Sequence, residues 1–157
     1  MRGKSKFMSN IISYDDVLEN FKKLLKANNL KYTTQRELIL KIIYDNDGHF
    51  TPEDIYNLIK MSYPQVKLGI ATVYRTLTLL EDANIVSSIS FGTQGKKYEF
   101  GLKDHHDHLV CLECGGIEEF FDETIEKLQE EIAKKYNFKM TNHIMKITGT
   151  CSACQAK

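Results

Sequence analysis

The 157-residue sequence contains no apolar run that approaches the ~20 residues needed to span a bilayer. Its first ten residues, MRGKSKFMSN, also lack the apolar stretch of a signal peptide. These absences argue against a membrane partner and predict a soluble, cytoplasmic protein. The segment 1–7 is either a native arm or a stretch that precedes a natural start at Met8, and the sequence leaves both alternatives open.

The chain has no internal repeat, no low-complexity tract and none of the common catalytic motifs. It contains no HExxH motif, no nucleophile elbow and no phosphate-binding loop. We therefore expect no catalytic residue and no small-molecule substrate. A metal-dependent enzyme stays in view only as an alternative, because the sequence does contain a histidine cluster.

A net charge of zero conceals an asymmetry between the two halves of the chain. Residues 1–103 contain 15 Lys and Arg against 11 Asp and Glu, a net charge of +4, whereas residues 104–157 contain 6 against 10, a net charge of −4. A basic half suits contact with phosphates, and an acidic half suits the binding of cations. The asymmetry is only a weak indication of nucleic-acid binding.

Helical signals dominate the first half. Ser13, a capping box at Thr34–Glu37, and Thr51 followed by Pro52 predict the starts of three helices. Asn28-Asn29, Asp47-Gly48 and Pro64 predict where these helices end. A fourth helix is predicted over 70–83, with an apolar side formed by Ile70, Val73, Leu77 and Leu80.

Two short strands are expected after the fourth helix, over 85–91 and 96–100, joined by the turn Gly92-Thr93-Gln94-Gly95. Helices followed by a β-hairpin give the order of a winged helix-turn-helix DNA-binding domain, with 70–83 as the recognition helix.

The second half alternates strand and helix signals. Strands are predicted over 109–111, 117–121 and 140–148, and Asp122 caps a helix that carries Ile125, Leu128, Ile132 and Ala133. The sequence therefore predicts an α+β protein in which residues 1–100 form an N-terminal arm and a winged helix-turn-helix domain, 101–104 form a hinge, and 105–157 form a small α+β domain.

All four cysteines lie in two CxxC pairs, Cys111/Cys114 and Cys151/Cys154. Two such pairs supply the four thiolates of a structural, tetrahedral zinc site that has no open position for catalysis. The 36 intervening residues exceed the spacing of a common zinc ribbon, but a strand, a helix and a strand between the pairs would bring them together. A redox dithiol and structural disulfides are the alternatives, which a reducing cytoplasm disfavours.

His105-His106-Asp107-His108 combines three of the five histidines with a carboxylate just before Cys111. Alternate side chains of an extended chain face opposite ways, so His106 and His108 would serve one metal site and His105 and Asp107 another. A polar loop with solvated histidines is the alternative. Judged without a family, the isolated His49 is a helix cap or a surface residue.

The predicted recognition helix begins with Ala71-Thr72-Val73-Tyr74-Arg75. Arginine can read guanine, and a tyrosine ring can pack on thymine methyl groups. Lys31 would reach a narrow, A·T-rich minor groove. The alternative is that Tyr74 packs in the core and Arg75 pairs with an acidic neighbour.

Several blocks of the sequence together resemble the ferric uptake regulator family, over about 15–154: LKYTTQR, HFTPEDIY, GIATVYRTL, KKYEF, HHDHLVCLECG, IEEF and TNHIMKITGTCSAC. The resemblance implies a winged-helix domain, a hinge and an α+β dimerisation domain. It also implies a homodimer whose recognition helices fit a double-stranded DNA operator, so that Thr72, Tyr74 and Arg75, with Lys31, stay the candidate DNA contacts.

The resemblance further implies two metal sites besides the zinc. Its regulatory site comprises His49, Glu99, His106, His108 and Glu119, which replaces the surface interpretation of His49. Its additional site comprises His105, Asp107, Glu126 and His143. The implied function is a metal-dependent repressor of iron-uptake genes, in which Fe(II) closes the hinge so that the dimer fits a palindromic A·T-rich operator.

Ligand type alone does not name the regulatory metal, because Mn(II), Co(II) and Zn(II) suit the same side chains. The resemblance favours Fe(II), since peroxide-sensing relatives tend to have Asp in place of Glu99 and Glu119, and zinc sensors often recruit a further cysteine. A zinc- or peroxide-responsive regulator is the alternative.

Overall fold

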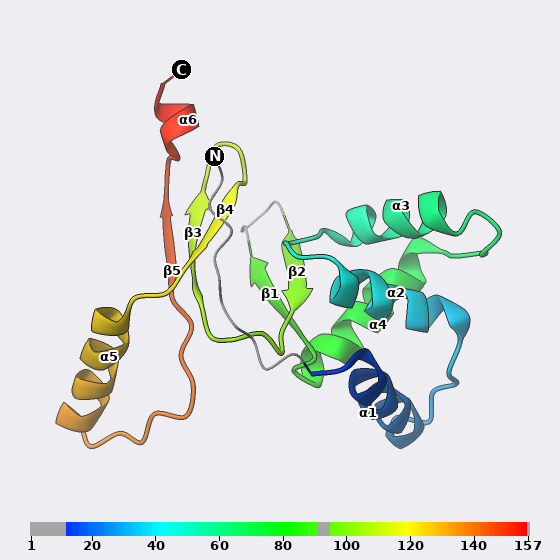
Figure 1. Cartoon of the computed structure of the whole chain (residues 1–157), viewed down its shortest axis with the longest axis horizontal. Coiled ribbons are helices and arrows are strands. Elements are labelled where there is room, and N and C mark those ends of the chain that lie inside the picture. Colours follow the sequence, from blue (N-terminus) through cyan, green and yellow to red (C-terminus); the bar gives the residue numbers. More distant parts are fainter. Residues whose placement is uncertain (1–11, 91–94, 157) are drawn as a thin grey trace. The chain divides into compact units, whose positions relative to one another are not determined.

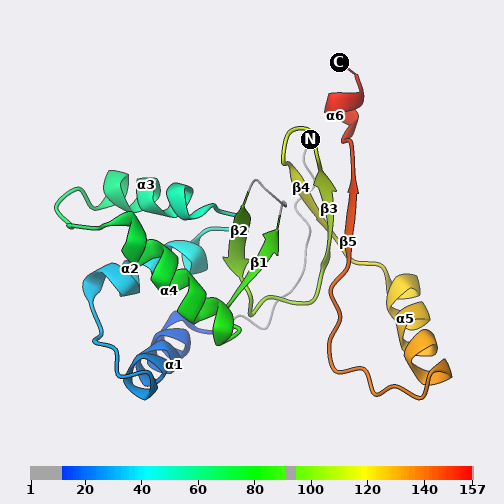
Figure 2. The same cartoon turned by 180° about the vertical axis from the view of Figure 1, so that it is seen from behind.

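The computed structural model describes residues 12–90 and 95–156, and the chain divides into two compact units, an N-terminal unit of residues 1–104 and a C-terminal unit of residues 105–157. Figure 1 and Figure 2 show the chain from opposite sides. The expected arm 1–7 and most of the expected hairpin turn, residues 92–94, lie outside the described residues. An α+β fold with helices first and a small sheet unit last is confirmed.

The described residues of the N-terminal unit form four helices and a two-stranded antiparallel sheet. Their bounds are α1 Tyr14–Ala27, α2 Thr34–Asp45, α3 Pro52–Ser62, α4 Ile70–Asp82, β1 Val86–Ser90 and β2 Lys96–Phe100. Each helix contributes apolar side chains to one core, among them Phe21, Ile39, Ile59 and Leu77, all 0% exposed. This shared core fixes α4 against the other helices and the hairpin.

The helix starts follow the capping signals, with one correction. Ser13 accepts a hydrogen bond from the Asp16 backbone N–H at the start of α1, and Thr51 with Asp54 forms a full capping box at the start of α3. The predicted capping box at Thr34–Glu37 is wrong. Thr33 caps α2 by accepting from the Arg36 N–H, and the Glu37 carboxylate accepts from the Tyr32 hydroxyl instead.

The apolar side of α4 is also narrower than predicted. Val73, Leu77 and Leu80 are buried, together with Thr76, but Ile70 is 38% exposed. Ile70 is the first residue of the helix, so its side chain lies at the edge of the core rather than over it.

The C-terminal unit is a three-stranded sheet with two helices, bounded as β3 Asp107–Cys111, β4 Ile117–Phe120, α5 Glu123–Lys135, β5 Lys146–Gly149 and α6 Ser152–Gln155. The strand order is β4-β3-β5, with β3 antiparallel to β4 and parallel to β5. Figure 1 shows β5 running beside β3, which brings the end of the chain back to the turn that follows β3.

Two predictions for the C-terminal unit need correction. The last strand begins at Lys146, so the predicted strand 140–148 is too long by six residues at its start, and the four-residue α6 was not predicted. Asp122 does cap α5, accepting from the N–H groups of Thr124 and Ile125. Among the described residues, no helix combines the length and the apolar character that crossing a membrane requires.

Candidate metal centres and the DNA-binding helix

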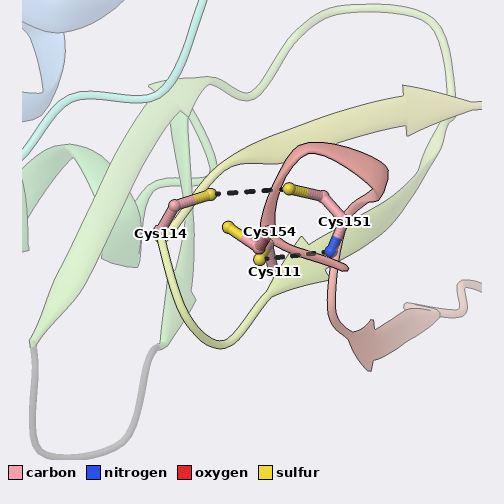
Figure 3. A group of neighbouring side chains, drawn as sticks. All are labelled: Cys111, Cys114, Cys151 and Cys154. Atoms are coloured by element: carbon pink, nitrogen blue, oxygen red, sulfur yellow. Dashed lines mark hydrogen bonds between the residues drawn. The ribbon is translucent and has the colours of Figure 1, made fainter. Parts of the chain in front are cut away.

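The four cysteine sulfurs lie together at one end of the three-stranded sheet, as Figure 3 shows. Parallel pairing sets Cys111 opposite Gly149, so β5 delivers Cys151 and Cys154 to the turn that contains Cys114. The Cys114 Sγ to Cys151 Sγ distance is 3.8 Å. A tetrahedron with Zn–S bonds of about 2.3 Å has S···S edges of about 3.8 Å, whereas a disulfide has an S–S bond of about 2.05 Å. The geometry fits a four-thiolate metal site.

Local hydrogen bonds also favour a thiolate at the centre of this group. Backbone N–H groups of Cys114 and Cys151 donate to the sulfur of Cys111 and lower the pKa of that thiol from 9.0 to about 6. The Cys151 N–H is 3.3 Å from the Cys111 sulfur. In contrast, hydrogen bonding to the sulfur of Cys151, in the same close group, raises the pKa of Cys154. Thiolates are the form in which cysteine binds metal.

A second group of possible ligands, His105, Asp107, Glu126 and His143, gathers at the start of β3, at the opposite end of that strand from Cys111. The Glu126 Oε1 atom lies 3.4 Å from both His105 Nε2 and His143 Nε2. His105 Nε2 is 3.6 Å from Asp107 Oδ1. These separations resemble those between ligands of one metal ion, for which ligand–metal bonds are about 2.0–2.2 Å.

Several polar atoms in this second group are buried without a hydrogen-bond partner among the described residues: both carboxylate oxygens of Asp107, Oε1 of Glu126 and Nε2 of His143. Asp107 is only 1% exposed. A buried carboxylate without a partner costs free energy unless a cation compensates it. The donor set therefore fits a bound metal ion.

In the N-terminal unit, His49 and Glu99 form a pair of possible ligands. Phe50 and Tyr98 exchange two backbone hydrogen bonds of 2.8 Å, and in an antiparallel bridge the residues on either side then lie opposite each other. His49 thus faces Glu99, with Nε2 at 3.4 Å from Oε2. The other Glu99 oxygen accepts a 3.2 Å hydrogen bond from Ser87.

His106, His108 and Glu119 form a corresponding partial set in the C-terminal unit. The register of β3 and β4 sets His108 opposite Glu119. His106 Nε2 lies 3.8 Å from Glu119 Oε1, and the two histidine rings are 4.8 Å apart. His105 and His106 precede the first residue of β3, yet they join different groups, in agreement with the expected alternation.

The residues proposed to contact DNA lie on α4 and before α2. Arg75 is exposed, Thr72 is half-buried and Tyr74 is 46% exposed, so Tyr74 does not pack in the core. Lys31 is exposed, and its carbonyl oxygen accepts a hydrogen bond from the Arg36 guanidinium. Arg36 contacts Lys31, and Glu53 contacts Tyr74. The sequence did not predict that these two residues support the proposed DNA contacts, because nothing in the local pattern distinguishes them from other charged residues.

Comparison with known proteins decides the family. The model of the ferric uptake regulator family matches residues 27–148. The chain belongs to the ferric uptake regulator family. It is 53% identical over 143 residues to the ferric uptake regulation protein of Campylobacter jejuni, covering 91% of each chain.

Two solved structures of the ferric uptake regulator family extend the comparison. The regulator of Helicobacter pylori, described as having three functional metal binding sites, is 37% identical, with a TM-score of 0.85 and coverage of 94% of this chain and 97% of its own. The regulator of Francisella tularensis, described as solved with iron, is 34% identical, with a TM-score of 0.71 and coverage of 80% and 95%. The chain is thus a metal-dependent transcriptional regulator of the ferric uptake regulator family, with one group of four cysteines and further His and carboxylate groups.

Proposed function

We propose that this ferric uptake regulator is an Fe(II)-responsive repressor of iron-uptake genes, which binds an A·T-rich palindromic operator as a homodimer. One observation carries the proposal. The chain has a partial set of N/O ligands in each unit, His49 with Glu99 before residues 101–104 and His106, His108 and Glu119 after them. Neither set alone fills the coordination sphere of a transition metal, and the two sets together would.

The proposed mechanism is linkage between metal binding and the arrangement of the two units. Two of the five proposed ligands precede residues 101–104 and three follow them. One metal ion can bind all five only when the two units adopt a particular arrangement. Metal binding therefore favours that arrangement. The recognition helices α4 of a dimer would then match the half-sites of a palindrome. A coupling of about 1–3 kcal/mol, typical of allostery, changes operator affinity about 5- to 150-fold.

Support for a homodimer comes from α5, which has no buried residue within one chain. Leu128 and Ile132 are 51% and 58% exposed on this helix, and Tyr136 and Phe138 follow it at 75% and 71%. An amphipathic helix with an uncovered apolar side needs a partner surface. We assign that surface to a second copy of the chain.

We assign Zn(II) to the four cysteines and a further metal to His105, Asp107, Glu126 and His143. The thiolate group closes β5 onto β3 and stabilises the C-terminal unit. For the regulatory site, imidazole and carboxylate ligands suit Fe(II), and Mn(II), Co(II) or Zn(II) are able to substitute. A zinc- or peroxide-responsive regulator would use the same scaffold with a different metal preference.

The deciding experiment is anaerobic fluorescence anisotropy on a labelled A·T-rich palindromic duplex at fixed salt. Zinc-retaining protein is titrated separately with Fe(II), Mn(II) and Zn(II). Tighter binding with Fe(II) or Mn(II), without added Zn(II), is the expected result. A response to trace Zn(II) alone would make the protein a zinc sensor, and no response to any metal would refute the five-ligand mechanism.

Neighbouring glutamates on β4 offer a matched test of the ligand set. We expect His106→Ala and Glu119→Ala to abolish metal-dependent tightening, because each removes a proposed ligand. Glu118→Ala removes the same charge one position earlier, where strand alternation directs the side chain to the opposite face. Normal metal dependence in His106→Ala, or its equal loss in Glu118→Ala, would undo the assignment.

A further inference from the structure

We propose that Glu53 is a positioning residue for operator recognition, whose carboxylate holds the ring of Tyr74 in the orientation that meets a thymine methyl group. The proposal rests on the function proposed above, in which Tyr74 on α4 contacts DNA bases. It adds a residue from α3, outside the recognition helix, that determines how well those bases are discriminated.

Tyr74 is joined to Glu53 by its hydroxyl group. The hydroxyl donates a 2.8 Å hydrogen bond to Glu53 Oε1, 21 residues away in sequence. The ring itself is 46% exposed, while its helical neighbours Val73 and Leu77 are 0% exposed. The hydrogen bond also raises the pKa of Tyr74 above its ordinary value of 10.0, so the hydroxyl stays protonated and remains a donor. One bond at the far end of a side chain with two rotatable torsions restricts the whole ring.

Glu53 lies in an ordered part of the N-terminal unit. It lies in the first turn of α3, between Pro52 and Asp54, where the Thr51–Asp54 capping box ties down the helix start. The Thr51 N–H donates to Asp54 at 2.8 Å, and the Asp54 N–H donates to Thr51 at 3.1 Å. A carboxylate is also favoured near the positive end of a helix dipole. Glu53 is therefore held in place by the ordered start of α3.

The space beside Tyr74 explains why this bond matters. A hollow of about 270 Å³ lies next to the ring, bounded also by Lys96 and Tyr98. Tyr74 and Glu53 both line this hollow, so a Tyr74 ring without its hydrogen bond has room to turn into it. Lys96 does not compete for Glu53, since its ammonium group is bound to both carboxylate oxygens of Glu81 at 3.0 and 3.1 Å.

The test is a comparison of thymine with uracil, because uracil lacks only the methyl group. The probe is the A·T-rich palindromic duplex that the parent chain with Mn(II) selects from random-sequence DNA. Each thymine of that duplex is replaced singly by uracil, and affinities are measured by anisotropy at fixed salt. The ratio of the two affinities cancels any effect of the Glu53 charge on phosphates, since that effect is the same for both duplexes.

In the parent chain, loss of the contacted methyl group should weaken binding about fourfold, the effect of one apolar carbon. Tyr74→Phe keeps the ring and loses the hydroxyl, and Glu53→Ala loses the acceptor. Both variants should reduce the thymine preference to less than about twofold, and the double variant should be no worse than either one. Glu53→Gln keeps an acceptor oxygen and should restore the preference. Glu19→Ala, which removes an exposed carboxylate on α1, is the charge control and should match the parent.

The outcomes separate this proposal from the function on which it rests. A parent chain that selects no duplex overturns the proposed operator function and this proposal with it. A parent chain that shows the thymine preference, together with an unchanged preference in Glu53→Ala, overturns the role of Glu53 alone. A thermal melt of Glu53→Ala that matches the parent excludes unfolding as the cause of any loss.

Discussion

Replacing Cys154 by Ser should unfold the C-terminal unit while the N-terminal unit stays folded. The reason is the unequal distribution of buried apolar side chains. The apolar core cluster lies entirely in the N-terminal unit, whereas Val110 and Cys111 are the buried apolar residues among the described part of the C-terminal unit. A bound metal must therefore contribute much of what holds β3, β4 and β5 together.

The expected magnitude follows from that imbalance. Full burial of one Val contributes about 1.5–3 kcal/mol, whereas a structural zinc contributes about 10–16 kcal/mol of apparent binding free energy. Loss of a third of the zinc contribution, about 3–5 kcal/mol, already exceeds the contribution of Val110. Amide hydrogens of β3 and β5 should then exchange roughly 10²- to 10⁴-fold faster.

Hydrogen exchange followed by mass spectrometry measures both units in one sample. Peptides from β1 and β2 serve as the internal reference and should keep their protection. Ser152→Ala is the matched variant, because it changes an exposed side chain beside Cys151 and removes no sulfur. If Cys154→Ser is shown to be free of zinc and β3 and β5 keep full protection, the stabilising role of the four-cysteine site is wrong.

Three further predictions concern separate parts of the molecule. Asp107→Asn should stabilise the metal-free chain by about 1–3 kcal/mol, since it removes a buried charge whose oxygens have no hydrogen-bond donor among the described residues, and should lower the bound-metal stoichiometry by one, as read by thermal melts and elemental analysis. Burial acts to raise the pKa of Glu81, but hydrogen bonds from Ser88 and Lys96 outweigh it and hold that pKa below 4.5, so Glu81→Gln should cost about 0.5–1 kcal/mol in urea unfolding at pH 7. A lowered folded-state pKa means that this cost is present above pH ~4.5 and disappears as pH falls through the folded pKa. Arg75→Ala should reduce discrimination at one base pair by about 1–3 kcal/mol in operator titrations and leave metal binding intact.

Each of these predictions has a contrary result. A metal-free Asp107→Asn chain that melts below the parent would mean that Asp107 has a stabilising partner. A Glu81→Gln difference that does not shrink as the pH falls below 4.5 would locate its cause outside the ionised carboxylate. Unchanged operator preference in Arg75→Ala would remove Arg75 from base recognition.

Local signals in the sequence predicted most of the helices. Ser13, Thr51 and Asp122 each accept the hydrogen bonds expected of a helix cap. The prediction failed where two candidates were adjacent, since Thr33 and Thr34 have the same chemistry, and it is Thr33 that has the extended backbone of an N-cap. It failed also over 140–145, where apolar residues suggested a strand, but β3 pairs with β5 only from Lys146 onward.

The candidate sites depended on information of a different kind. The cysteine pairs and the His105–His108 run are visible in the sequence because their members are close together. The pairing of His49 with Glu99 is not, because it depends on the bridge between Phe50 and Tyr98, 48 residues apart. Residue types alone gave no reason to join them, and the family resemblance supplied that link.

Strand β2 sets a fixed spacing between two attachments in the N-terminal unit. Lys96 at its first position is tied to α4 through Glu81, and Glu99 at its fourth position faces His49, so three residue steps of about 3.3 Å separate the two attachments. An extended strand cannot lengthen or shorten appreciably, and its successive side chains point to opposite faces. One inserted residue between these positions would turn the Glu99 side chain to the opposite face and lengthen the spacing at the same time. Relatives that differ in length here would have to change both the proposed metal ligand and the ion pair that attaches α4.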